Sequence, residues 1–197
     1  MIDFYRPDGT PVSVLRGDPR QLNDATFHAG TNSGSEYEYV DTFNSLHFYV
    51  LKTYRNAQGV LFYDVAVRRT TGASPFVRGL SLGAPTKTGQ RPGFIATCTF
   101  PLTNTGQAGT GIFDSDVYRV SATSSSDRWQ VTLPNALAAV KTGQTAQIPV
   151  HVLRNPEIDA ANRTTITLTA TSESDSTKTA TRTCSLSTPD TTPGGQG

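Results

Sequence analysis

The clearest strand in this chain is the stretch Cys98-Thr99-Phe100-Pro101-Leu102-Thr103-Asn104-Thr105-Gly106. Every second residue along it and just before it is apolar, which is the period of a β-strand with one buried face. The Asn-Thr-Gly end is typical of a turn. We therefore predict that this stretch is the first strand of a β-sandwich. Its inward residues are Phe94, Ala96, Cys98, Phe100 and Leu102.

Five further segments of the second half show the same alternation. Short strands at this spacing, without a helical period, predict an immunoglobulin-like sandwich over residues 87–188. Arg182 shares the inward parity of the last segment, so we expect it near an edge, at a bulge, or extended toward solvent. The apolar positions are Tyr118, Val120 and Ala122; Trp129, Val131 and Leu133; Ala146, Ile148, Val150 and Val152; Ile166, Leu168 and Ala170; and Ala180, Cys184 and Leu186.

The two cysteines of the chain, Cys98 and Cys184, lie in the first and last of these segments. Because the first and last strands of such sandwiches often lie side by side, a disulfide between them is geometrically reasonable. Closing a loop of about 86 residues would stabilise the fold by roughly 4–5 kcal/mol in the chain-entropy model. Two unpaired buried thiols stay the alternative, since two cysteines alone are weak evidence for an oxidising compartment.

The first half predicts a hairpin of two strands, residues 46–54 and 60–68, joined by a short loop at 56–59. Apolar residues alternate along the second of these strands and are expected to face a core, with Asp64 and Arg68 outward. The inward residues are Leu61, Tyr63, Val65 and Val67.

Two breaks in composition divide the chain. Residues 83–93 are small, polar and interrupted by prolines, which predicts a linker with a boundary near residue 86. We expect residues 1–86 to form a β-sandwich or jelly-roll-like unit. Residues 189–197 are rich in Pro and Gly and are predicted to be a disordered tail. The expected fold is all-β, with two β-sandwich units.

Charge and hydropathy exclude some classes of partner. The net charge is +1 and charged residues are 17% of the chain, so no basic surplus indicates nucleic acid. No apolar run approaches the roughly 20 residues of a membrane span. The Thr-rich, Lys-poor β composition is typical of secreted, extracellular chains. Because Met1–Phe4 lacks the basic and apolar parts of a signal peptide, we expect a piece of a longer protein.

No catalytic constellation is visible in the sequence. His28, His47 and His151 have no metal-binding spacing, and no Gly-x-Ser-x-Gly motif occurs. We interpret the histidines as structural. The alternative is a small enzyme that uses His28 with a carboxylate such as Asp24 or Asp41.

Asp114-Ser115-Asp116 contains the best pair of carboxylates. Two acidic side chains around one turn can bind Ca²⁺, which prefers several oxygen ligands. The alternative is a solvated turn between strands, because no complete calcium-loop pattern follows. Apart from this Ca²⁺, we predict no cofactor.

Aromatic residues gather in the first half. Tyr37, Tyr39, Tyr49 and Tyr54 are candidates for a surface that binds polysaccharide or another cell-surface component, because aromatic rings stack on sugars. Core packing of these rings is the alternative interpretation.

The segment 94–106 resembles the immunoglobulin-like domain at the C-terminus of bacterial secreted hydrolases, the type associated with α-galactosidases. Trp129–Pro134, Lys141–Ala146 and Thr164–Ser172 match other marks of that family, and the resemblance covers residues 92–187. It implies a non-catalytic accessory module.

The first half, through Asn23–Phe27 and Tyr63–Arg68, is similar to the region downstream of the catalytic domain in secreted metallopeptidases of the immune inhibitor A type. The zinc motif of those enzymes is absent from this chain. The resemblance therefore implies an active site upstream of these residues.

These observations lead to the hypothesis of a non-catalytic, stabilising C-terminal region of a secreted bacterial hydrolase, a peptidase. Its expected partner is the catalytic domain of the parent protein, with no nucleic acid and no membrane span. The alternative is a module that binds carbohydrate or a cell surface.

Overall fold

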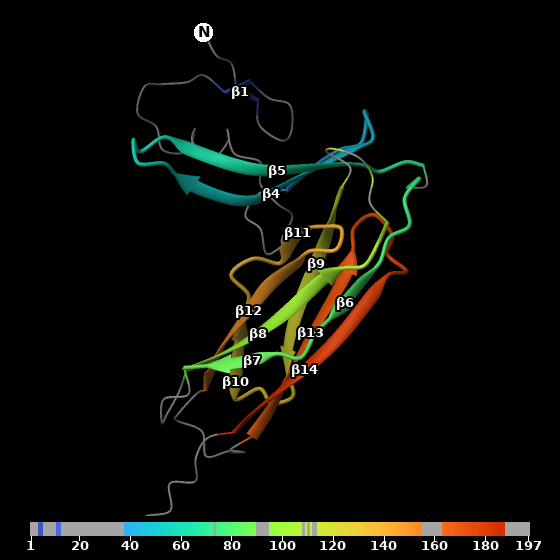
Figure 1. The fold of residues 1–197 in the computed structure, drawn as a ribbon. Coiled ribbons are helices and arrows are strands. Elements are labelled where there is room, and N and C mark those ends of the chain that lie inside the picture. The colour runs from blue at the N-terminus through green and yellow to red at the C-terminus, as the bar shows by residue number, and fades with distance from the viewer. Residues whose placement is uncertain are drawn as a thin grey trace, which may run out of the picture. The chain divides into compact units, whose positions relative to one another are not determined.

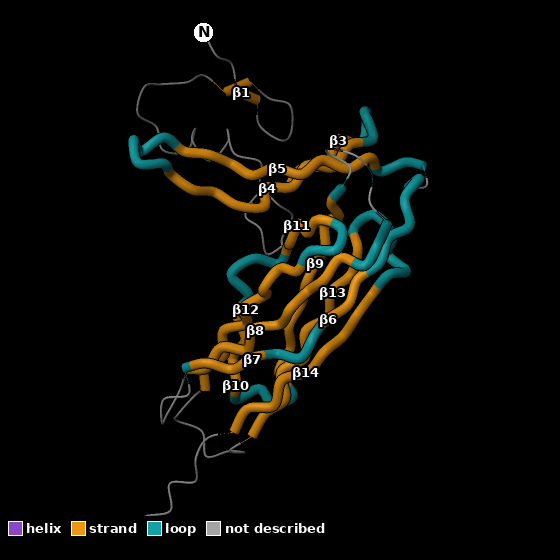
Figure 2. Tube along the Cα trace, in the orientation of Figure 1, coloured by secondary structure: helices purple, strands orange, loops and turns teal. Residues whose placement is uncertain are grey.

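A computed structural model describes residues 4–5, 11–12, 38–72, 74–89, 95–107, 109, 111, 114–154 and 163–187. All regular elements among them are β-strands, as Figures 1 and 2 show. The all-β prediction is therefore confirmed. No helix in this part of the chain is long and apolar enough to cross a membrane. The chain forms two compact units, Met1–Thr71 and Gly72–Gly197.

The described strands of the first unit form two sheets. β1 (Phe4–Tyr5) pairs with β2 (Pro11–Val12). β3 (Glu38–Asp41), β4 (Leu46–Arg55) and β5 (Leu61–Arg69) form an antiparallel sheet in the order β3-β4-β5. The predicted hairpin is confirmed.

The side chains of Asn56 and Arg55 hold the loop between β4 and β5, and Arg55 Nη1 donates to the Gly59 carbonyl at 2.8 Å. Asn56 Oδ1 accepts hydrogen bonds from the backbone N–H groups of Gln58 and Val60, at 3.0 and 2.9 Å. Gly59 has φ 78°, a left-handed conformation that glycine adopts without steric cost. Polar turn chemistry therefore closes this hairpin.

One prediction about β5 is wrong. Tyr63, Val65 and Val67 do lie on one face, but they are 44%, 53% and 55% exposed instead of facing a core. Alternation shows that residues share a face, and it does not show whether another layer covers that face. Arg68, expected outward, donates from Nε to the Tyr49 hydroxyl at 3.1 Å. The sandwich or jelly-roll form of this unit stays a prediction.

The second unit is a sandwich of two antiparallel sheets (Figure 1). One sheet has the order β10-β12-β8-β6, with β7 also paired to β8, and the other has the order β11-β9-β13-β14. The strands of the first sheet are β6 (Leu80–Leu82), β7 (Thr86–Thr88), β8 (Ile95–Asn104), β10 (Trp129–Thr132) and β12 (Thr145–Arg154). Those of the second are β9 (Ser115–Ser124), β11 (Leu137–Lys141), β13 (Arg163–Ser172) and β14 (Thr179–Ser187).

The core of this unit lies between the two sheets and follows the predicted alternation. Burying these apolar side chains is the main favourable contribution to folding. Arg182 is exposed on β14, at the edge of its sheet, as predicted. Phe94 lies outside the described residues. Buried members from both sheets include Ala96, Phe100, Leu102, Tyr118, Val120, Trp129, Ile148, Val150, Val152, Ile166, Leu168, Ala170 and Leu186.

The predicted boundary near residue 86 is wrong, because β6 and β7 belong to the second unit. Leu80 pairs with Asn104, and Thr86 pairs with Thr99. The turn after β8 also joins the segment before β6, since Thr105 N–H donates to the Gly79 carbonyl at 3.0 Å. Strands of three residues are too short to show a period. They could therefore not be told apart from a linker in the sequence.

The disulfide between Cys98 and Cys184 is present, as predicted. It connects β8 to β14, with their Cα atoms 6.4 Å apart, and both cysteines are buried. The two strands lie in different sheets, so the bond crosses the core instead of linking strand neighbours. It joins the two layers of the sandwich.

We predict that replacing both cysteines by alanine lowers the free energy of unfolding by roughly 4–5 kcal/mol, because the unfolded chain loses a long closed loop. Urea denaturation of the two proteins would measure this loss. Reductant should destabilise the natural chain and leave the double variant unchanged. Equal stability of the two proteins would contradict the prediction.

Candidate functional site

The most buried carboxylate in the described second unit belongs to Asp116 on β9. Ser172 Oγ donates to its Oδ2 at 2.7 Å, and Ser174 Oγ donates to its Oδ1 at 2.7 Å. Arg78 Nη1 lies 4.0 Å from Oδ1. These donors and this cation compensate for the lost hydration of a buried charge.

Arg78 and Tyr118 extend this cluster. Arg78 donates to the Ser115 carbonyl from Nη1 at 3.2 Å and to Ser74 Oγ from Nε at 3.2 Å. The Tyr118 hydroxyl donates to the Gly79 carbonyl at 2.9 Å. Burial, and then the charge of Asp116, raise the pKa of Tyr118, so its hydroxyl stays protonated as a donor. The cluster ties residues 74–79 to the sandwich.

Asp114 lies in a different environment from Asp116. Its Oδ1 accepts a hydrogen bond from Ser115 Oγ at 2.8 Å, and its Oδ2 lies 3.2 Å from Lys141 Nζ. The Ser115 bond, and then Lys141, hold the pKa of Asp114 below its ordinary value. The contacts of both carboxylates are thus with protein donors, and a calcium ion at this pair stays a prediction.

A second polar cluster lies on the β3-β4-β5 sheet. His47 Nε2 is 2.8 Å from Glu38 Oε1, and the His47 ring stacks on Tyr49 at 4.0 Å. The sequence analysis missed Glu38. Only the strand register, which pairs Val40 with His47 and Glu38 with Tyr49, brings the two groups together.

The other candidates for catalysis are placed apart. His151 Nδ1 shares a hydrogen bond of 3.0 Å with Thr97 Oγ1 on the neighbouring strand. Asp41 accepts hydrogen bonds from the N–H and the side-chain amide of Asn44, at 3.0 and 2.7 Å. His28 and Asp24 lie outside the described residues.

The candidate ligand-binding tyrosines have unlike surroundings. Tyr39 and Tyr54 are 48% and 41% exposed, whereas Tyr49 is fully buried and offers no ring face to a ligand. The Tyr54 ring stacks on Phe62 at 5.5 Å, and Lys52 Nζ lies 5.2 Å from its centroid. Tyr37 lies outside the described residues.

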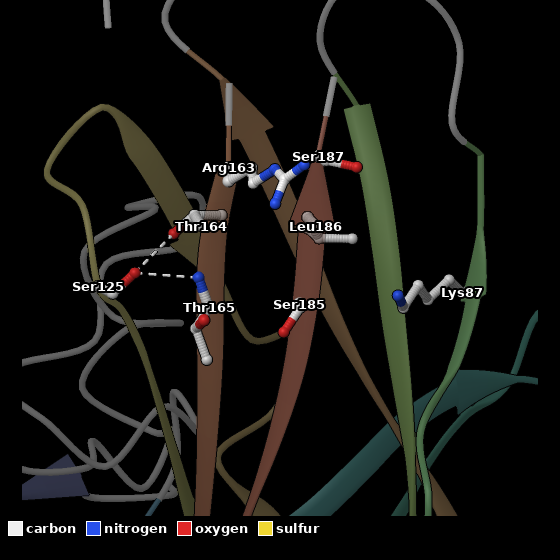
Figure 3. Close-up of a pocket in the computed structure, with 8 residues that line it drawn as sticks. All are labelled: Lys87, Ser125, Arg163, Thr164, Thr165, Ser185, Leu186 and Ser187. Atoms are coloured by element: carbon white, nitrogen blue, oxygen red, sulfur yellow. Dashed lines mark hydrogen bonds between the residues drawn. The ribbon is translucent and has the colours of Figure 1, made fainter. Parts of the chain in front are cut away.

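An open hollow of about 510 Å³ lies among β7, β13 and β14 and the turn after β9 (Figure 3). The sequence analysis did not predict it. The described lining holds two cations and several hydroxyl groups but no imidazole, thiol or carboxylate, so it offers no general base. The lining residues are Lys87, Ser125, Arg163, Thr164, Thr165, Ser185, Leu186 and Ser187.

Comparison with known proteins adds a curated relative and solved structures. A protein of Arthroderma benhamiae named "Putative secreted metallopeptidase" is 43% identical over 182 residues, which cover 84% of this chain. This chain spans 26% of that relative's length. The relative is fungal, so the bacterial origin that we expected gains no support.

Two solved structures have low similarity to part of the chain. A FixG-related protein from Vibrio parahaemolyticus is 16% identical with a TM-score of 0.42, covering 57% of this chain and 96% of its own. An α-2-macroglobulin fragment from Escherichia coli is 16% identical with a TM-score of 0.36, covering 58% of this chain and 16% of its own. The immunoglobulin-like type of the sandwich therefore stays a prediction.

Two family models match the chain. One, described as a middle domain, covers residues 1–70, and the other, described as a peptidase M6-like domain, covers residues 79–188. Together with the secreted relative and the disulfide, they place this chain in a secreted, peptidase-related protein. The chain belongs to the peptidase M6-like domain family.

Proposed function

We propose that this chain is a non-catalytic, stabilising C-terminal region of a secreted metallopeptidase. The observation that carries the proposal is the state of Asp116. Its two oxygens are occupied by Ser172, Ser174 and the neighbouring Arg78, all from its own fold. A general base or a metal ligand needs a lone pair that is open to substrate or ion.

The role that follows is mechanical. The disulfide fastens one sheet of the second unit to the other, and the Asp116 cluster fastens the segment before β6 to the same sandwich. A stiff module of this kind would stabilise the catalytic domain of a longer chain. The family membership and the relative, of which the match covers only 26%, support such a parent.

Binding of carbohydrate is the rival proposal, through exposed rings of the first unit. A sugar stacks on a free aromatic face. Phe62 and the Lys52 ammonium already lie against the Tyr54 ring, which leaves less of that ring for a ligand. The geometry of the described tyrosines therefore favours the stabilising role.

We predict that the purified chain hydrolyses neither casein nor a fluorogenic peptide mixture above the buffer rate, with or without added Zn²⁺ and Ca²⁺. A zinc peptidase of known activity serves as the positive control. Hydrolysis that co-purifies with the chain and disappears in His47→Ala would overturn the proposal, because Glu38 and His47 form a histidine–carboxylate pair, 2.8 Å apart.

Asp116→Ala should lower the free energy of unfolding by roughly 3 kcal/mol, because it leaves the Ser172 and Ser174 hydroxyls without their acceptor and Arg78 without its counter-charge. Asp114→Ala is the matched control, and it should cost much less, since its ion pair with Lys141 is solvent-screened. Urea denaturation measures both.

The same two variants test the calcium prediction. If the carboxylates act only within the fold, Ca²⁺ and EDTA give the same melting temperature for the natural chain. A rise of melting temperature in Ca²⁺ that both variants lose would make these residues ligands and would contradict the structural interpretation of Asp116.

A further inference from the structure

The β3-β4-β5 sheet has one face made of apolar side chains. Residues that pair across antiparallel strands point to the same side, and so do residues two apart along a strand. The register joins Tyr39 to Phe48 and Phe48 to Val67, and it joins Val50 to Val65. The contact between the Tyr39 and Phe48 rings, 6.3 Å between centroids, agrees with this assignment. We call this set, with Tyr63, the apolar face.

The outer strands of the apolar face are open to solvent. Tyr39 on β3 is 48% exposed, and Tyr63, Val65 and Val67 on β5 are 44–55% exposed. On the central strand, Val50 is only 8% exposed, so the exposed apolar area lies along the outer strands. Several apolar side chains that stay about half exposed on one sheet face usually mark an interaction site, because leaving them in water costs free energy. Scattered single apolar residues would need no such explanation.

Two opposite charges lie at one end of the apolar face. Asp41 on β3 pairs with Leu46 on β4, and Leu46 pairs with Arg69 on β5. The three residues therefore form one row across the sheet, with the carboxylate on one outer strand and the guanidinium on the other. Hydrogen bonds from the Asn44 side chain and N–H hold the pKa of Asp41 below its ordinary value, which keeps it charged at neutral pH. Arg69 has no ion pair with any other residue that the structure describes.

This arrangement is complementary to itself. A twofold axis parallel to β4 and above the apolar face would place β3 of one copy over β5 of the other. Asp41 of each copy would then face Arg69 of its mate, while the apolar rows between them meet. Isologous contacts of this kind are the commonest among homo-oligomers, and aligned packing of two sheets is a standard sandwich geometry.

We propose that the apolar face is the interface of a homodimer, occupied by the same face of a second copy of this chain. The dimer is held by burial of Tyr39, Tyr63, Val65 and Val67, and its orientation is set by the two Asp41–Arg69 pairs. This inference does not depend on the proposed accessory function.

The first experiment measures the mass of the natural chain in solution by light scattering and sedimentation, from about 1 to 200 µM, the range of moderate affinities. We expect a concentration-dependent dimer. Val67→Lys should weaken it at least tenfold without changing the melting temperature, because the Val67 side chain is more than half exposed. A natural chain that stays monomeric over this range overturns the proposal.

Charge reversal tests the orientation. Arg69→Asp places two carboxylates opposite each other, and Asp41→Arg places two cations opposite each other, so each variant alone should dimerise at least tenfold more weakly. Mixing the two should restore a dimer containing one copy of each, because both contacts are then of opposite charge. The Asp41→Arg/Arg69→Asp double variant should also recover self-association.

Two controls keep the outcome clear. Arg182→Asp makes the same charge change at an exposed strand position of the second unit and should leave the dimer intact. Melting curves show whether Asp41→Arg folds, since Asp41 also caps the turn to Asn44; if it does not, Arg69→Asp and Val67→Lys decide the matter. A dimer that survives both of these would place the interface elsewhere and refute the proposal.

Discussion

The second unit depends on the bond between Cys98 and Cys184, which crosses its core and joins one sheet to the other. Two sheets that pack face to face are otherwise held by non-directional apolar contacts. A covalent link between them restricts the unfolded chain across most of the unit, and this favours the folded state. Such a bond persists in oxidising surroundings, which agrees with the secreted relative.

Hydrogen bonds and ion pairs hold particular residues of the second unit against each other, which non-directional apolar packing does not do. The Asp116 carboxylate, Arg78 and the Tyr118 hydroxyl join the segment that enters the second unit to the interior of its sandwich. A buried charge is tolerated there because hydroxyl donors and a cation surround it. A buried carboxylate is a common mark of a functional site. At Asp116 the burial is explained by the structural contacts of the carboxylate.

The first unit differs from the second in how far its apolar side chains are exposed. Its β3-β4-β5 sheet leaves Tyr39, Tyr63, Val65 and Val67 about half exposed on one face, with Asp41 and Arg69 at one end. In the second unit, the corresponding residues of each sheet meet those of the other sheet. The exposed apolar side chains of the outer strands are the reason for proposing an interface on the first unit.

The sequence by itself indicated β8, β9, β10, β12, β13 and β14 of the second unit, the positions of the two cysteines in the first and last of them, and the hairpin of the first unit, because a period of two and turn chemistry are local properties of the chain. Only the tertiary structure decided that β6 and β7 join β8, that Tyr63, Val65 and Val67 stay open, and that Glu38 meets His47. It also separated Asp116, bound to Ser172 across 56 positions, from Asp114 at the surface. These outcomes depend on which strands become neighbours, and long-range pairing leaves no local period in the sequence.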